Sequence, residues 1–150
     1  MQDAINFVQL TETIGTSGQP TETQFAAIAA AGYTGVINLA MPDSDNAIAN
    51  EGAVVTGLGM SYIHIPVPFE SPSVDHLRQF FGAMAIFEGR KVWVHCAVNA
   101  RVSAFLYHYL SKVKQLPEAQ CRSSVLDRWQ PSMDQVWKDF ISMPAQQVLA

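Results

Sequence analysis

The sequence contains few cysteines, no excess of positive charge and no long apolar segment, and these absences exclude several classes of protein. Two cysteines in 150 residues are too few for a disulfide framework. The formal net charge of −4 does not favour binding to nucleic acid or to an acidic membrane surface. No apolar run approaches the ~20 residues that span a membrane, and the chain does not begin like a signal peptide. We therefore expect a cytoplasmic protein without a membrane or nucleic-acid partner.

Histidine and cysteine are also too scattered for a zinc site. The four histidines and two cysteines show none of the spacings that zinc sites require. No repeat, low-complexity segment or charge block divides the chain, and 150 residues, 49% of them hydrophobic, suffice for one sizeable core. The sequence thus predicts a single domain over residues 1–150 that uses no cofactor.

Strand-like and helix-like segments alternate along most of the chain. Thr21 with Gln24 forms a capping box at the start of one helix, and Ser73 caps another. The expected strands cover residues 5–10, 36–39, 62–65 and 92–94, and the first is expected to turn back as a hairpin at residues 11–14. The expected helices cover residues 21–31, 48–58, 73–88 and 100–113. This alternation predicts an α/β fold with a mostly parallel central sheet and helices on both faces.

The end of the chain is expected to be helical. One amphipathic stretch contains Val125, Leu126 and Trp129 and ends at Pro131. A second stretch is expected to start at Ser132, with one apolar face made by Met133, Val136, Trp137, Phe140 and Ile141. We expect this aromatic tail to pack against the sheet layer rather than to bind a partner.

The segment from Lys91 to Ser103 carries the functional prediction. An apolar strand leads into a short loop at Cys96, and a helix follows. The expected buried face of that helix contains Val102, Phe105, Leu106, Tyr109, Leu110 and Val113. The unpaired N–H groups and the dipole of a helix start favour an anion. Such a setting also favours a reactive thiolate at Cys96, and the planar fork of donors of Arg101 suits phosphate oxygens.

The pair His95-Cys96, followed by Arg101 and Ser103, resembles the signature of cysteine-dependent protein tyrosine and dual-specificity phosphatases. That signature reads His-Cys, five residues, Arg, then Ser or Thr. Residues 18–21, 32–40 and 59–67 follow in an order similar to a bacterial branch of these enzymes, so the resemblance covers roughly residues 12–112. It implies a phosphotyrosine phosphatase-like fold and hydrolysis of a phosphomonoester through a phosphocysteine, without a metal.

The spacing within the loop departs from this signature. Only four residues separate Cys96 from Arg101, whereas Ser103 keeps the usual distance from the cysteine. Either the loop has lost one residue, or Arg101 lies one place early and Val102 occupies the usual arginine position. One place in a helix corresponds to about 100° of rotation, so Arg101 must reach the phosphate along a different path.

The resemblance implies catalytic roles for Cys96, Arg101 and an acid that protonates the leaving oxygen. The family places an aspartate on the loop after the preceding strand, and in this chain Glu70 is the nearest carboxylate. His95 would orient the loop and bind the substrate, and Ser103 would donate to the departing thiolate. The other residues expected to bind the substrate are Ala97, Val98, Asn99, Ala100 and Val102.

Three functions remain open from the sequence. The first is an active phosphatase whose partner is a phosphorylated protein or a small phosphoester. The second is a pseudophosphatase that binds phosphate-bearing ligands without turnover. The third is a rhodanese-like sulfurtransferase, since rhodaneses also place a cysteine in a loop between strand and helix. In all three, the loops at residues 40–46 and 66–72 are expected to meet the cysteine loop at the carboxyl edge of the sheet.

Overall fold

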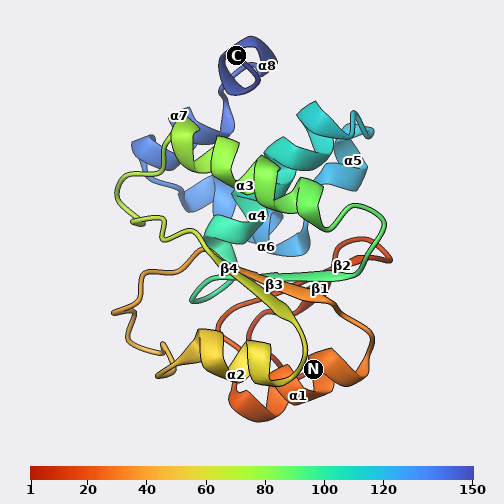
Figure 1. Cartoon of the computed structure of the whole chain (residues 1–150). Helices are drawn as coiled ribbons and strands as arrows, with labels where there is room; N and C mark the ends of the chain where they lie inside the picture. The colour runs from red at the N-terminus through yellow and green to blue at the C-terminus, as the bar shows by residue number, and fades with distance from the viewer.

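The protein folds around a five-stranded sheet, which is seen in a computed structural model that describes residues 1–150 (Figure 1). The strand order is β1-β2-β5-β3-β4. The strands are β1 (Val8–Gln9), β2 (Ile14–Ser17), β3 (Gly35–Asn38), β4 (Ser61–His64) and β5 (Val92–His95). Only β1 and β2 pair antiparallel, and the other neighbours are parallel. The predicted α/β fold with a mostly parallel sheet is therefore confirmed.

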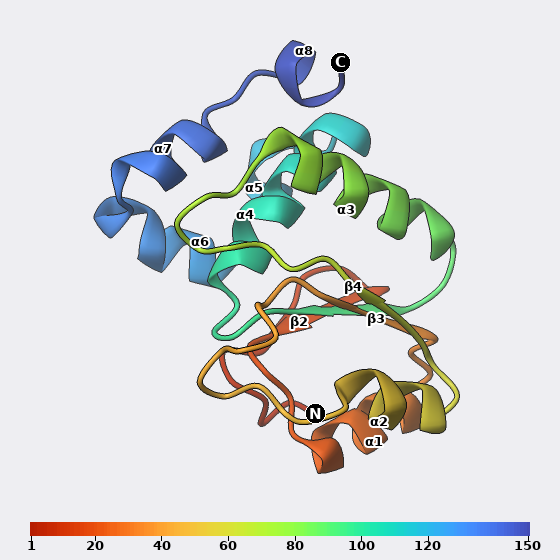
Figure 2. The ribbon, with the colours of Figure 1, turned by 60° about the vertical axis from the view of Figure 1, so that its left-hand side comes forward.

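Helices cover both faces of the sheet. Helices α1 (Glu22–Ala30) and α2 (Glu51–Gly57) lie on one face. The other face carries α3 (Val74–Ile86), α4 (Ala100–His108), α5 (Glu118–Cys121), α6 (Ser124–Trp129), α7 (Gln135–Ile141) and α8 (Ala145–Val148). The same two layers are visible after a 60° turn (Figure 2). None of the helices combines the length and the apolar character needed to cross a bilayer.

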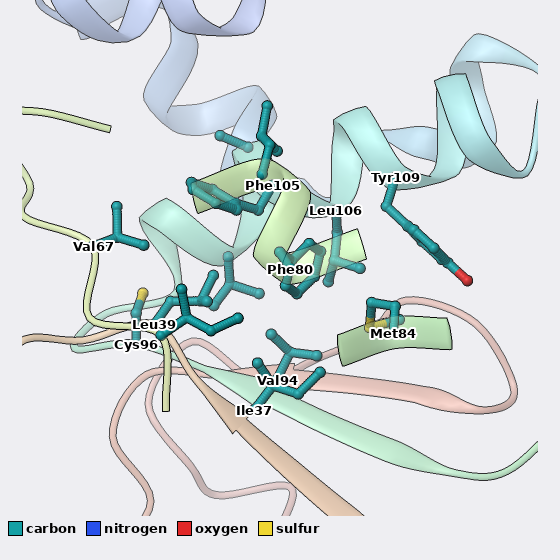
Figure 3. Close-up of a cluster of buried hydrophobic side chains, with 14 of the residues drawn as sticks. Ile37, Leu39, Val67, Phe80, Met84, Val94, Cys96, Phe105, Leu106 and Tyr109 are labelled. Atoms are coloured by element: carbon teal, nitrogen blue, oxygen red, sulfur yellow. The ribbon is translucent and has the colours of Figure 1, made fainter. Parts of the chain in front are cut away.

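Alternation along β5 divides its side chains between two cores. Val94 and Cys96 belong to a cluster of 27 buried residues under α3 and α4, whereas Trp93 belongs to a cluster of 8 residues on the α1–α2 face. Figure 3 shows Cys96 in the larger cluster, close to Leu39 and Val67. The strand therefore delivers the Cys96 side chain to one face of the sheet and the preceding His95 to the other.

The predicted helix starts are mostly confirmed. The side chain of Thr21 accepts from Gln24 N, and Gln24 returns the bond as a capping box before α1. Ser73 caps α3 through the N–H of His76. The helix expected through residues 48–58 begins only at Glu51, because Asn50 takes a left-handed conformation (φ 56°) directly before it.

The strand expected over residues 5–10 is shorter than predicted. Only Val8–Gln9 pair with β2. Asn6 has a φ of 50°, which interrupts an extended strand, and its side-chain amide donates to the Val98 carbonyl. The first residues of the chain are thus diverted from the sheet to the cysteine loop.

Two expected core residues are exposed instead. Val113 is 42% exposed, because α4 continues as a π-helix over Tyr109–Val113 and the wider turn moves this residue off the buried face. Val136 is 43% exposed, and α7 is capped by Asp134 rather than starting at Ser132. The other members of the predicted apolar face in the tail are buried: Met133, Trp137, Phe140 and Ile141.

Candidate active site

The loop after β5 lies against the end of β2. Cys96 N–H donates to the Ser17 carbonyl at 3.4 Å, and Gln19 N–H donates to the Ala97 carbonyl at 3.1 Å. Gly18 approaches so closely that a Cβ there would lie 2.4 Å from the Ala97 carbonyl oxygen. The segment at residues 18–20 therefore fixes the backbone directly after the cysteine.

Two asparagines hold the other side of the loop. Asn46 donates from Nδ2 to the Ala97 carbonyl at 3.0 Å, so the loop at residues 40–46 does reach the cysteine loop as expected. Asn6 donates from Nδ2 to the Val98 carbonyl at 2.9 Å, and its own carbonyl accepts from Asn99 Nδ2 at 2.8 Å. The sequence did not indicate this contribution from the first residues of the chain.

The carbonyl groups of the loop are thus satisfied, whereas its N–H groups are free. No backbone N–H of residues 97–102 donates to an acceptor in the protein, and the first that does is Ser103, to the Asn99 carbonyl at 3.1 Å. Asn99 has a φ of 73° and directly precedes α4. A left-handed residue beside a helix start turns successive N–H groups toward one concave surface, which is an anion-binding arrangement.

Arg101 is a buried cation without a counterion. Only 6% of its surface is exposed, and it forms no ion pair with a carboxylate. Its Nη1 donates to the Val67 carbonyl at 2.9 Å, its guanidinium lies 5.8 Å from the ring centre of Phe69, and its buried Nε has no partner. An unpaired buried charge is unfavourable, so this guanidinium is available to pair with an anionic ligand.

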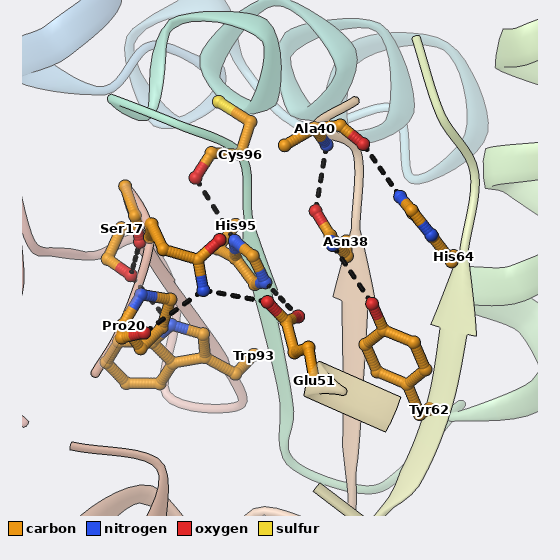
Figure 4. A network of polar contacts seen from close by, with 12 residues as sticks. Ser17, Pro20, Asn38, Ala40, Glu51, Tyr62, His64, Trp93, His95 and Cys96 are labelled. Atoms are coloured by element: carbon orange, nitrogen blue, oxygen red, sulfur yellow. Dashed lines mark hydrogen bonds and ion pairs between the residues drawn. The ribbon is translucent and has the colours of Figure 1, made fainter. Parts of the chain in front are cut away.

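A buried network on the opposite face of β5 supports the loop (Figure 4). His95 is completely buried, and its Nε2 lies 2.6 Å from Oε2 of Glu51 while its Nδ1 lies 3.1 Å from the Cys96 carbonyl oxygen. Gln19 donates to the other carboxylate oxygen of Glu51 at 2.7 Å. Two segments far apart in the sequence, α2 and the residues after β2, therefore meet at His95.

The hydrogen bonds also define where the protons lie. A carbonyl oxygen only accepts, so Nδ1 of His95 donates to Cys96. Burial alone would raise the pKa of Glu51, but the hydrogen bond and charge of His95 and the bond from Gln19 outweigh it, and the pKa lies below its usual 4.5. Glu51 therefore stays ionised, and its carboxylate lies beneath the loop against Nε2 of His95.

A second branch of polar contacts fixes the start of the loop at residues 40–46. Asn38 accepts from Ala40 N at 2.8 Å and donates to the Tyr62 hydroxyl at 3.0 Å. His64 Nε2 lies 2.7 Å from the Ala40 carbonyl. Burial, opposed by the bond from Asn38 but assisted by the charge of Glu51, raises the pKa of Tyr62 to about 12, so this hydroxyl remains a neutral partner.

The remaining predicted site residues have different surroundings. Cys96 is 1% exposed and Val98 is 48% exposed. The side chain of Val102 lies in the core, so only the backbone of Val102 can face a ligand. The Ser103 hydroxyl donates to the Ala100 carbonyl at 2.6 Å, because the helix turn places this carbonyl within its reach.

Glu70 lies on the loop between β4 and α3 without an ion pair or hydrogen bond of its side chain. Its turn is closed by the bond from Ser71 N to the Pro68 carbonyl at 3.1 Å. The preceding residue, Phe69, contacts Arg101 and is anchored by Trp137, whose Nε1 donates to its carbonyl at 2.7 Å. The carboxylate is therefore exposed at the tip of a turn whose base is tied to the site.

Comparison with known proteins identifies the family. A family model described as "Beta-lactamase hydrolase-like protein, phosphatase-like domain" matches residues 6–111. The chain belongs to this family. Beta-lactamase hydrolase-like proteins from two strains of Xylella fastidiosa are 34% identical to it over 113 residues, which make up 73% of this chain and 25% of each relative. The matched part thus spans about a quarter of those relatives.

Solved structures agree with the family and the fold. A DUF442 protein from Shewanella putrefaciens CN-32, described as a candidate phosphatase, is 36% identical and superposes with a TM-score of 0.85, covering 94% of this chain and 91% of that one. Tk-PTP in its active form is 20% identical, with a TM-score of 0.74 and coverage of 97% and 99%. The predicted resemblance to protein tyrosine phosphatases is therefore confirmed at the level of fold, and the protein is a phosphatase-like domain.

No group of three or more His, Cys, Asp or Glu side chains lies close enough together to hold a metal ion. Sequence reasoning also missed Glu51, which lies 44 positions before its partner His95. Only its place after the loop at residues 40–46, at the edge where the site was expected, could have drawn attention to it.

Proposed function

We propose that this phosphatase-like domain hydrolyses phosphomonoesters, from a phosphorylated protein or a small phosphoester, through a phosphocysteine at Cys96. The observation that carries the proposal is Arg101, a buried guanidinium with no carboxylate partner and an orphaned Nε. It belongs to a segment with six unpaired N–H groups, those of residues 97–102. A phosphoryl group supplies the negative charge and the acceptor oxygens that all these donors lack.

The reaction would proceed in two steps. The Cys96 thiolate attacks phosphorus, an S–P bond forms, and the ester P–O bond breaks as the leaving oxygen takes a proton. Water then attacks the phosphocysteine, the S–P bond breaks, and inorganic phosphate leaves as the thiolate is restored. Arg101 and the loop N–H groups would bind the equatorial oxygens in both steps, where the charge of the phosphoryl group is spread.

Glu70 is the proposed proton donor of the first step. Its turn follows Phe69, whose ring contacts Arg101, so a small movement of this exposed tip would bring the carboxyl group toward the leaving oxygen. In the second step the same carboxylate would accept a proton from the attacking water.

The test is the hydrolysis of p-nitrophenyl phosphate between about pH 4.5 and 8, the range in which a carboxylic acid and a thiolate both act. Wild-type protein is compared with Cys96→Ser, and with Cys121→Ser as a control at a buried cysteine remote from the loop. We expect vanadate-sensitive turnover that is lost only in Cys96→Ser. A phosphocysteine trapped by rapid acid quench would identify the intermediate by mass.

Absence of turnover with retained phosphate binding would instead identify a pseudophosphatase. Isothermal titration with inorganic phosphate measures that binding directly. Loss of affinity in Arg101→Ala would then show that the loop is still the anion site.

A sulfurtransferase is the second candidate, and the position of Glu70 favours it. The side chain of Glu70 forms no hydrogen bond or ion pair with the site, and transfer of a sulfane sulfur needs no acid, since sulfite leaves as an anion. The Cys96 thiolate would attack the outer sulfur of thiosulfate, forming a cysteine persulfide as the S–S bond breaks and sulfite departs. Thiocyanate production from thiosulfate and cyanide by the wild type, and not by Cys96→Ser, would establish this activity in place of the phosphatase.

A further inference from the structure

A groove of about 300 Å³ opens directly beside the candidate phosphate loop. Its lining combines the exposed side of the loop with residues of the first segment and of α6. The lining residues are Asn6, Val98, Ala100, Val125, Arg128 and Trp129. Because Val98 and Ala100 belong to the loop itself, the groove and the anion site share one wall.

The shared wall is held in place from the groove side. Asn6 donates to the Val98 carbonyl at 2.9 Å and accepts from Asn99 at 2.8 Å, so the groove residue and the loop backbone form one unit. The apolar side chain of Val98 is 48% exposed. It projects from the loop whose backbone N–H groups form the candidate anion site. An apolar side chain in this place offers contact to the part of a ligand that extends beyond its phosphoryl group.

The opposite wall joins an aromatic surface to a second cation. Trp129 is half-buried, and its ring lies 5.9 Å from that of Phe69, which in turn contacts Arg101. Arg128, the residue before it, is exposed and forms no ion pair. The site therefore has one buried guanidinium in the loop and one free guanidinium in the adjoining groove, with apolar surface in between.

A carboxylate lies next to Arg128 in the sequence, but it pairs with another arginine. Arg122, just before α6, forms ion pairs with Asp127, at 2.7 Å, and with Glu118, at 3.5 Å. Arg128 follows Asp127 directly in the sequence but faces the groove instead. Its position in the last turn of α6 is favourable to a cation through the helix dipole, and this contribution is present with or without a ligand.

We propose that the groove binds the body of the substrate and that Arg128 binds a second anionic group on it, a carboxylate or a second phosphate. The substrate class is thus an acidic phosphomonoester with a planar or apolar core that covers Val98 and Trp129. This inference rests on the proposed phosphatase activity for its first anionic group. Because the net charge of the protein is −4, a local cation such as Arg128 favours binding of such an anion against the overall charge.

The test compares phenyl phosphate with its 3- and 4-carboxylated derivatives. In the wild type, kcat/KM should be higher for at least one carboxylated ester. Arg128→Gln should lower the ratio of carboxylated to plain ester by about two- to fivefold, as expected for one charge pair at an exposed side chain. Arg128→Lys should restore part of the ratio, because it keeps the charge without the fork. The matched control is Arg90→Gln, an exposed arginine before β5 at the far end of the sheet, which should leave the ratio as it is.

The Cys96→Ser protein separates this inference from the proposed activity. Titration of that protein with the same three esters measures binding without turnover. The same titration is made with Arg128→Gln added to Cys96→Ser. If the wild type shows no turnover, but Arg128→Gln weakens binding of the carboxylated ester more than binding of phenyl phosphate, the groove assignment holds and the phosphatase proposal fails. Turnover with a ratio unaffected by Arg128→Gln, or no binding of any ester, would overturn the groove assignment.

Discussion

Replacement of Glu51 is the change that most directly tests how the loop is supported. In Glu51→Ala, Nε2 of His95 and Nε2 of Gln19 both lose an acceptor that now lies at 2.6 and 2.7 Å. His95 is completely buried and Glu51 is 7% exposed, so water does not replace the carboxylate readily. Removing one partner of a buried ion pair costs about 3–5 kcal/mol. For a domain of this size, that corresponds to a decrease in Tm of about 6 to 20 °C.

Glu51→Gln is the matched variant that keeps the shape and removes the charge. The carboxamide oxygen can accept from Gln19, while its NH2 group donates to Nε2 of a neutral His95 that still donates from Nδ1 to Cys96. Every polar group then has a partner, and we expect a loss of at most about 1.5 kcal/mol. Glu12→Ala, at an exposed carboxylate with no ion pair, is the control and should change Tm very little.

The pH dependence of the two proteins gives an independent measure. The pKa of Glu51 in the folded protein is lower than its usual 4.5, so its stabilising contribution is complete above that value and is lost as the pH falls through the folded-state pKa. Urea unfolding of wild type and Glu51→Gln should therefore give stabilities that differ at neutral pH and converge in acid. A Glu51→Ala protein that melts within about 1 °C of the wild type, or a difference that is constant with pH, would refute this account of the network.

Three further changes test other parts of the site. Arg101→Ala should weaken phosphate and vanadate binding by at least about tenfold, which titration measures. It should cost little stability in the free protein, because a buried unpaired charge is removed, and thermal unfolding with and without phosphate measures that stability. Gly18→Ala should destabilise by about 2 kcal/mol and lower activity, since its Cβ would lie 2.4 Å from the Ala97 carbonyl, whereas Gly57→Ala, with nothing within 4 Å, should not destabilise. Glu70→Gln should lower the rate on phenyl phosphate more than on p-nitrophenyl phosphate, whose leaving group hardly needs a proton; equal losses on both would exclude a general-acid role.

The sequence predicted the fold well because local patterns and global topology agree in this chain. The helix caps, the apolar strands and the periodic helices were each visible within about ten residues, the range over which side-chain periodicity acts. The π-helix at Tyr109–Val113 was not visible, since nothing in its composition distinguishes it from one more turn of α4. Its consequence, the exposure of Val113, was therefore also missed.

The site was predictable only where it is local. The cysteine loop with Arg101 lies within one short segment, so the order of its residue types carried the prediction. The supports of the loop come from Asn6, the residues after β2 and Glu51, which reach it across 44 to 92 positions in the sequence. Such contacts depend on the strand order and on which face each residue of β5 occupies, and neither can be derived from a single carboxylate or amide in the sequence.

The geometry of α4 favours one of the two alignments that the short loop allowed. Arg101 and Val102 are neighbours separated by about 100° of helix rotation, and their environments differ accordingly. Arg101 turns its guanidinium to the Val67 carbonyl beside the Phe69 ring, whereas Val102 is completely buried in the core. A cation at position 102 would thus be directed into apolar packing, away from the loop. Ser103 matches the family's hydroxyl residue only if the loop has its usual length. The hydroxyl of Ser103 is already engaged, since it donates to the Ala100 carbonyl. Both observations favour a loop that has lost one residue, with the left-handed Asn99 closing the shorter path and Arg101 taking the place of the family's arginine.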